Sequence, residues 1–212
     1  MKKIIVLSAL FIVFPFKCLA AEDDFQLWSQ FSKGFYKKGK FDLRLYMEGR
    51  FNNDAHDALG YFFGPTFQYK VNKTLSFGGA AKMIHFKSGE HFLKFQRYEG
   101  EFSLNFKQLS WLKFQNRNRF EYFRREDADR KRSRLRLKFT VPLNSNGLLS
   151  GLYFGNEFFY DHDRTEMQRN RLTPIGLSFK LGQKRSLNVF YLLEHLRSSG
   201  VDNHILGTYL TF

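Results

Sequence analysis

The segment Lys113–Leu143, KFQNRNRFEYFRREDADRKRSRLRLKFTVPL, contains the pattern that decides the fold class. In its first half, charged or amide residues at 113, 115, 117, 119 and 121 alternate with Phe114, Asn116, Asn118, Phe120 and Tyr122. In its second half, Arg and Lys at 132, 134, 136 and 138 alternate with Ser133, Leu135, Leu137 and Phe139. A period of two places the two sets on opposite faces of a β-strand. The segment therefore predicts a long hairpin with one charged face, one largely apolar face and a polar loop between its strands.

The charged face of this hairpin restricts where it can lie. A water-soluble protein could hardly bury an arginine ladder of this length, because unpaired buried charges are costly. A transmembrane barrel satisfies both faces, since the apolar face contacts lipid and the charged face lines a wet, ion-paired interior. Asn116 and Asn118 interrupt the apolar face, so either the register slips there or they lie near a membrane boundary.

Similar alternation recurs along most of the chain. With the two central strands, it predicts about ten antiparallel strands, the others covering residues 40–51, 59–71, 74–86, 91–107, 149–160, 169–181, 186–196 and 204–212. Tight turns alternate with longer polar loops, as in outer-membrane barrels, and the short turns are periplasmic if the C-terminus is. Asp24–Phe35 is an open point, because single-chain bacterial barrels have an even number of strands. It could be an eleventh strand, a piece in the lumen or under the barrel mouth, or a sign of twelve strands.

The N-terminus has the pattern of a secretory signal. Lys2 and Lys3 precede the apolar run Ile4–Phe16, and small residues precede Ala21. The expected organisation is a signal peptide at 1–20, removed after export, an N-terminal segment at 21–39 and a barrel at 40–212. Cys18 is the only cysteine, so the exported chain would have no disulfide. No later stretch is apolar for long enough to form a transmembrane helix, so a membrane location requires a closed barrel.

The chain is strongly basic. Its formal net charge of +14 falls to +11 when the three lysines of the signal are removed. Anionic lipid head groups or an acidic solute are the partners that fit this charge. Nucleic acid is not expected, because the chain is exported and has no helical basic face or nucleic-acid motif. No cofactor or metal site is predicted.

The last residues, HILGTYLTF, are similar to the C-terminal recognition strand of bacterial outer-membrane barrels. Gly207, Leu210 and the terminal Phe212 carry this assembly signal, and Leu206, Leu210 and Phe212 share one face. The similarity implies insertion into the bacterial outer membrane by the barrel-assembly machinery, with outer-membrane lipid and lipopolysaccharide as surroundings.

Several segments together resemble an uncharacterised family of bacterial outer-membrane β-barrel proteins (DUF2490-like). The resemblance covers essentially the whole exported chain. It rests on RNRFEYFRRE and RKRSRLRLKFTVPL in the central hairpin, GNEFFYD from Gly155, QRNRLTPIGLSFKL from Gln168 and the closing NHILGTYLTF. It implies a barrel in the outer membrane and no established activity.

The lumen-facing charges allow two interpretations. The predicted ladder consists of Arg44, Glu48, Arg50, Glu99, Glu101, Arg117, Arg119, Glu121, Arg132, Arg134, Arg136 and Glu157. In the favoured interpretation, arginines and glutamates pair and fill a narrow barrel, which suits the forked geometry of Arg–carboxylate pairs. In the alternative, the arginines line a small channel for anions or acidic oligosaccharides.

A rim-site hydrolase is the less favoured enzymatic hypothesis. Asp161, His162 and Asp163 lie in one predicted loop and Asp127 and Asp129 in its neighbour, where they could imitate an Asp–His site. Nothing in the sequence fixes their geometry, no Gly-x-Ser-x-Gly or His-Glu-x-x-His motif is present, and a metal-ligand set is incomplete. The sequence therefore predicts no catalytic activity. A rival fold, a soluble lipocalin-type barrel with its apolar faces inward, stays open because alternation does not say which face is inside.

Overall fold

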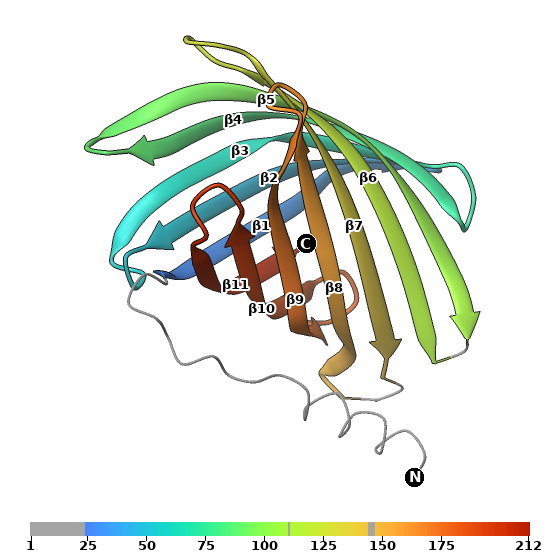
Figure 1. Cartoon of the computed structure of the whole chain (residues 1–212). Helices are drawn as coiled ribbons and strands as arrows, with labels where there is room; N and C mark the ends of the chain where they lie inside the picture. The colour runs from blue at the N-terminus through green and yellow to red at the C-terminus, as the bar shows by residue number, and fades with distance from the viewer. Residues whose placement is uncertain (1–23, 110, 144–146) are drawn as a thin grey trace.

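The computed structural model describes residues 24–109, 111–143 and 147–212, which form a closed barrel of eleven strands with no helix among these residues (Figure 1). The predicted signal at 1–20 lies outside the described residues. Each strand is paired with its neighbours in chain order. Their bounds are β1 Asp24–Lys38, β2 Phe41–Asn52, β3 Asp57–Lys70, β4 Leu75–Ser88, β5 His91–Leu109, β6 Leu112–Arg124, β7 Arg130–Pro142, β8 Leu149–Asp161, β9 Glu166–Lys180, β10 Ser186–Leu196 and β11 Asp202–Thr211.

The first strand, β1, closes the barrel. It pairs antiparallel with β2 and parallel with β11, so that Leu27 lies opposite Leu206 and Phe31 opposite Leu210. The expectation of ten strands was therefore wrong, as was the alternative of twelve, and Asp24–Phe35 lies in the wall itself. An even number is required only when the closing pair is antiparallel, and a parallel closing pair allows an odd number.

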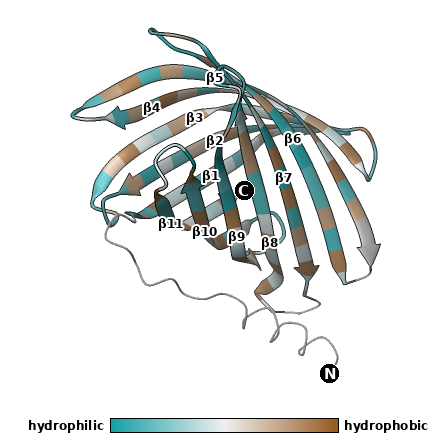
Figure 2. Ribbon diagram, viewed as in Figure 1, coloured by the Kyte–Doolittle hydropathy of each residue, from teal (hydrophilic) through white to brown (hydrophobic). Residues whose placement is uncertain are grey.

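Hydrophilic and hydrophobic residues alternate along the strands (Figure 2), and the apolar face of the wall is outside. Met47, Phe63, Phe77 and Phe102 expose between 40 % and 48 % of their surface on neighbouring strands. Charged residues point inward instead, and Glu121 is completely covered. The lipocalin-type alternative, which needs apolar faces inward, does not describe this barrel.

Connections at the two ends of the barrel have similar lengths. At the end where Phe212 lies, they contain two to six residues, and at the opposite end two to five. The expected difference between tight turns and longer loops is absent because the strands extend into the predicted loops. β7, for example, begins at Arg130 and β9 at Glu166. No described segment forms a helix that is long and apolar enough to cross a bilayer.

The interior also contains apolar side chains, in two small clusters. Trp28, Leu192 and Ile205 form one cluster, against which Phe190 packs. The other contains Phe62, Ile84 and Phe123, with Phe86 and Phe95 packed against it. The lumen therefore contains both charged and apolar side chains, as expected where side chains fill a narrow barrel.

Candidate functional site

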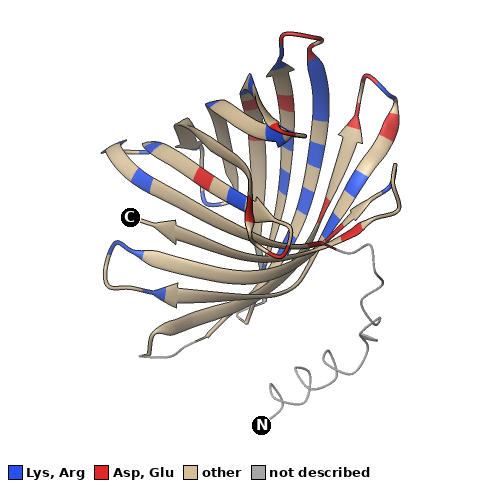
Figure 3. Ribbon diagram, turned by 90° about the vertical axis from the view of Figure 1, so that its left-hand side faces the viewer, with Lys and Arg blue, Asp and Glu red and all other residues tan. Residues whose placement is uncertain are grey.

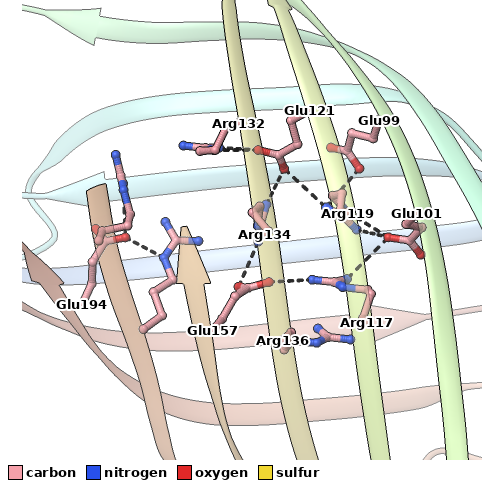
Figure 4. A network of polar contacts seen from close by, with 12 residues as sticks. Glu99, Glu101, Arg117, Arg119, Glu121, Arg132, Arg134, Arg136, Glu157 and Glu194 are labelled. Carbon is pink, nitrogen blue, oxygen red and sulfur yellow. Dashed lines mark hydrogen bonds and ion pairs between the residues drawn. The ribbon is translucent and has the colours of Figure 1, made fainter. Parts of the chain in front are cut away.

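Two neighbouring strands, β6 and β7, carry half of the arginines that line the lumen, and positive residues repeat along the wall in Figure 3. Their register places Arg117 opposite Arg136 and Arg119 opposite Arg134. Like charges in directly opposite positions are destabilising unless neighbouring groups compensate them. Glutamates from β5, β6 and β8 provide that compensation (Figure 4).

Two glutamates link the arginines into a network. Glu121 binds Arg132 and Arg134 through separate oxygens, at 2.5 Å and 2.6 Å. Glu157 on β8 divides its oxygens between Arg117, at 2.8 Å, and Arg134, at 2.9 Å. Arg134 therefore bridges both carboxylates, which the planar guanidinium fork allows.

A second group of ion pairs lies on the β5 side of this network. Glu99 Oε1 is 2.9 Å from Lys82 Nζ and 2.7 Å from an Arg97 nitrogen, while Glu99 Oε2 is 3.0 Å from Arg119. Glu101 accepts two hydrogen bonds from Arg119, at 2.9 Å and 2.6 Å. Each of these carboxylates is therefore held by cations from neighbouring strands.

A third group of contacts lies on the wall around β1, from β9 to β2. Glu194 on β10 binds Arg169 at 3.2 Å and Arg171 at 2.5 Å. The Arg171 guanidinium lies 4.7 Å from the centre of the Trp28 ring, and the Arg50 guanidinium lies 3.9 Å from it. Strands β2 and β9 therefore meet on an aromatic ring of β1, and cation–π attraction adds to the packing there.

The lumen contains two adjoining chambers. The C-terminal chamber, toward the end where Phe212 lies, has a volume of about 480 Å³, and the opposite chamber has about 400 Å³. Five residues line both chambers, and we call them the waist: Trp28, Arg50, Arg97, Arg134 and Arg171. The waist lies in the lumen where the two chambers adjoin.

The C-terminal chamber has a large excess of positive charge. Ten Arg and Lys side chains line it, against four Glu. Arg136 donates a hydrogen bond to Gln115 at 3.2 Å, and its Nε is buried without a partner. The Lys138 Nζ lies 3.7 Å from the centre of the Tyr153 ring. Within the described part of the chain, neither Arg136 nor Lys138 has an ion pair.

All twelve residues of the predicted ladder lie on the inner face. Ten of them line the C-terminal chamber, Arg132 lines the opposite one, and Glu121 is buried in the wall between its arginines. Arg44 is set apart, because it donates hydrogen bonds to the Ser32 hydroxyl and the Phe212 carbonyl, each at 2.8 Å. Glu48 accepts hydrogen bonds from Tyr46 and Arg50.

Sequence reasoning left several lumen residues out of the ladder. Lys82, Arg97, Lys138, Arg171 and Glu194 all line the chambers. Arg97 and Lys138 follow the same alternation as the ladder and could have been included on that signal. The other three lie in strands whose alternation is weaker, so only the three-dimensional pairing reveals them.

The residues of the predicted assembly signal lie in the closing strand β11. Gly207 points inward under the Phe190 ring, where an added Cβ would lie 2.1 Å from a ring carbon. Its role in this barrel is therefore to admit that ring. Leu210 pairs with Phe31 of β1. The Phe212 carbonyl accepts a hydrogen bond from the Gly34 amide, and the Phe212 ring lies 4.9 Å from that of Phe31.

The acidic and histidine residues considered for catalysis are not brought together. Asp161 forms an ion pair with Arg130 and lines the opposite chamber. His162 lies on the outer side, with a ring nitrogen 2.7 Å from the Ser133 hydroxyl and its ring 5.1 Å from that of Tyr160.

The other loop acids have local roles. Asp163 accepts a hydrogen bond from the Lys131 amide at 2.7 Å. Asp129 accepts hydrogen bonds from the Tyr122 hydroxyl and from the Arg125 amide. The pKa of Asp127 is lowered by the Ala128 amide that donates to its carboxylate. The carboxylates of Asp127 and Asp129 are therefore held within their own turn, and that of Asp163 is held by the backbone of β7.

Comparison with protein families gives a direct match. The family described as "Protein of unknown function (DUF2490)" matches residues 25–204, which include β1 except Asp24, all of β2 to β10, and the first three residues of β11. The chain belongs to this family. No curated protein matches the chain by sequence. Membership of DUF2490 agrees with the resemblance seen in the sequence and assigns no activity.

Solved structures give only distant likenesses. An anion-selective porin from Comamonas acidovorans is 12 % identical with a TM-score of 0.41, over 84 % of this chain and 55 % of the porin. The β domain of the Bordetella autotransporter BrkA is 12 % identical with a TM-score of 0.47, over 84 % of each chain. The siderophore receptor PirA from Pseudomonas aeruginosa is 13 % identical with a TM-score of 0.29, over 81 % of this chain and 34 % of the receptor. The chain spans about half the length of the porin, and none of these likenesses bears on function.

Proposed function

We propose that this DUF2490 protein is a bacterial outer-membrane β-barrel, inserted by the barrel-assembly machinery in contact with lipid and lipopolysaccharide. The apolar outer face and the charged inner face support this location, since lipid-facing and lumen-facing residues alternate in that way in transmembrane barrels. Cell fractionation tests it. The protein should be recovered with the outer membrane and need detergent for release, and deletion of Phe212 should leave it unassembled. Recovery in the soluble periplasm would contradict the proposal.

Within that location, we propose that the barrel is closed at rest and is not a general diffusion pore. The observation that carries this proposal is the waist, where Arg50 of β2 and Arg171 of β9 both pack on Trp28 of β1. Planar-bilayer recordings should give little or no steady current for the wild type. Trp28→Ala should raise the conductance, and Trp111→Ala, at an exposed turn, should not. A steady wild-type current would overturn closure.

A second candidate is a small channel for anions or acidic oligosaccharides. The excess of ten cationic over four acidic side chains in the C-terminal chamber favours it. A channel of this kind would carry a steady, anion-selective current that falls in Arg134→Ala or Arg136→Ala while folding is unchanged. The same recordings therefore decide between the two functions.

We propose that the barrel has no catalytic activity. Asp161 is held by Arg130 on the inner side, whereas His162 lies against Ser133 on the outer side. A general base and the group that orients it need to lie within hydrogen-bond distance of one another. Changing Asp161, His162 and Asp163 together to Ala should leave any cellular phenotype unaltered. Loss of hydrolysis of phospholipid, lipid A or peptide in that variant would make the protein an enzyme.

A further inference from the structure

Two cations of the C-terminal chamber, Arg136 and Lys138, lack counter-charges for a reason that lies in the register. Arg136 is directly opposite Glu157, the one carboxylate that could pair with it across β7 and β8. Both oxygens of Glu157 are taken by Arg117 and Arg134. Lys138 lies between Gln115 and Gly155, so neither of its cross-strand neighbours is acidic.

The surroundings make this lack of counter-charge unfavourable in free energy. Arg136 and Lys138 are both half-buried, and Arg117, directly opposite Arg136, adds a third positive charge nearby. Partly buried cations without a counter-ion lose hydration, which one hydrogen bond to Gln115 and the Tyr153 ring replace only in part. The Nε atoms of Arg117 and Arg136 are both buried without hydrogen-bond partners. An anion that enters the chamber would supply both the missing charge and acceptors for free guanidinium donors.

The rest of the chamber lining indicates what else the ligand carries. Beside Arg44 and Glu48 of β2, it contains six uncharged polar side chains from β1, β3, β9 and β10: Gln30, Ser32, Thr66, Gln68, Thr173 and Asn188. These hydroxyl and amide groups can donate to and accept from a hydroxylated body. Three tyrosine rings, of Tyr46, Tyr153 and Tyr209, provide flat surfaces in the same chamber. Its volume of about 480 Å³ lies in the range of small-molecule sites.

We propose that the C-terminal chamber is a binding site for an oxyanion carried on a hydroxylated body of one or two sugar rings. Arg136 and Lys138 bind the carboxylate or phosphate group, and the amide and hydroxyl wall binds the ring hydroxyls. The site lies on one side of the waist, so binding there does not depend on whether the waist conducts.

Calorimetric titration of the detergent-solubilised full barrel at low ionic strength tests the proposal with four probes: D-glucuronate, glucose 6-phosphate, inorganic phosphate and glucose. The wild type should bind glucuronate or glucose 6-phosphate more tightly than either inorganic phosphate or glucose. The stronger of the two acidic sugars identifies the oxyanion. Absence of binding by both would overturn the site, and equal binding of inorganic phosphate would overturn the sugar-binding wall.

Matched variants locate the binding. Arg136→Gln and Lys138→Gln should each weaken binding of the preferred acidic sugar by about tenfold or more, the effect of losing one charged hydrogen bond. Arg164→Gln, an exposed change outside the chamber, should leave it intact. Folding is checked by circular dichroism and by heat-modified gel mobility. If either lumen variant fails to fold, Gln68→Ala in the uncharged polar lining serves instead, and should weaken binding of the sugar but not of inorganic phosphate. Unchanged binding in these folded variants would overturn the assignment.

Discussion

One face of strand β7 contains two pairs of cations with different surroundings. Arg132 and Arg134 are held by Glu121, and Arg134 also by Glu157, at distances between 2.5 Å and 2.9 Å. Arg136 and Lys138, the next two inward residues of the same strand, have no ion pair in the part of the chain that the structure describes. The same residue types at the same spacing therefore have a structural role in one half of the strand and are available to a solute in the other.

The difference comes from the neighbouring strands. Glu121 on β6 lies opposite Arg132 and binds both members of the first pair, and Glu157 on β8 binds Arg134 although it lies opposite Arg136. Gln115 and Gly155 flank Lys138 instead. Buried ion pairs that are fully hydrogen-bonded tolerate the loss of hydration, but removal of one partner leaves an uncompensated charge. Changes in the paired half should therefore affect folding, and changes in the unpaired half should affect binding.

The largest effect is expected for Glu121→Gln. The change keeps the shape of the side chain and removes the charge that compensates Arg132 and Arg134. Because Glu121 is completely covered, the free energy of unfolding should fall by about 3–5 kcal/mol. Urea unfolding in detergent micelles measures it.

Glu166→Gln is the matched control for this change. Glu166 is exposed and lies 3.8 Å from Arg164, so the free energy of unfolding should change by less than about 1 kcal/mol. Equal losses in the two variants would mean that the network is as wet as the protein surface.

A smaller effect is expected for Arg134→Gln, compared with Arg136→Gln on the same strand. Loss of Arg134 should lower the free energy of unfolding by about 2–3 kcal/mol, because Glu121 and Glu157 each retain a second arginine. Loss of Arg136 should change it by less than about 1 kcal/mol, since no carboxylate loses a partner. The same urea experiment, without acidic solutes, compares the two. A greater loss from Arg136→Gln would refute the division of β7 into paired and unpaired halves.

How much of the fold the sequence alone predicts depends on how far apart along the chain the interacting residues lie. Period-two alternation predicted ten strands, because it depends only on neighbours along the chain. It left open whether Asp24–Phe35 is an eleventh strand, because the parallel pairing of Phe31 with Leu210 joins the two ends of the chain. The predicted connections also differed too much in length, because polar residues such as Arg130 and Glu166 extend the strands beyond the apolar pattern.

The lumen shows the same limit. Inward arginines and glutamates could be predicted from the alternation, but their partners could not. Arg171 and Trp28 meet only after β9 and β1 are brought together by closure of the barrel. The lack of a counter-charge at Lys138 likewise depends on two neighbouring registers that the sequence does not specify.

The smallest effect is expected at the rim of the barrel, where the Asp129 carboxylate is hydrogen-bonded but exposed to water. The Tyr122 hydroxyl donates to Asp129 and, with the Arg125 amide, holds the pKa of Asp129 below its usual value. A lowered carboxyl pKa stabilises the fold above the pKa of the unfolded chain, and that contribution is lost as the pH falls through the folded pKa. Tyr122→Phe should raise the pKa of Asp129 toward its ordinary value, as followed by an NMR titration of the carboxyl carbon.

Tyr98→Phe is the control, because the Tyr98 hydroxyl donates to Gln96 instead. Since Asp129 is fully exposed, urea unfolding at neutral pH should scarcely distinguish Tyr122→Phe from the wild type. A loss of stability there as large as that of Glu121→Gln would show that burial is not what separates the network in the lumen from the contacts at its rim.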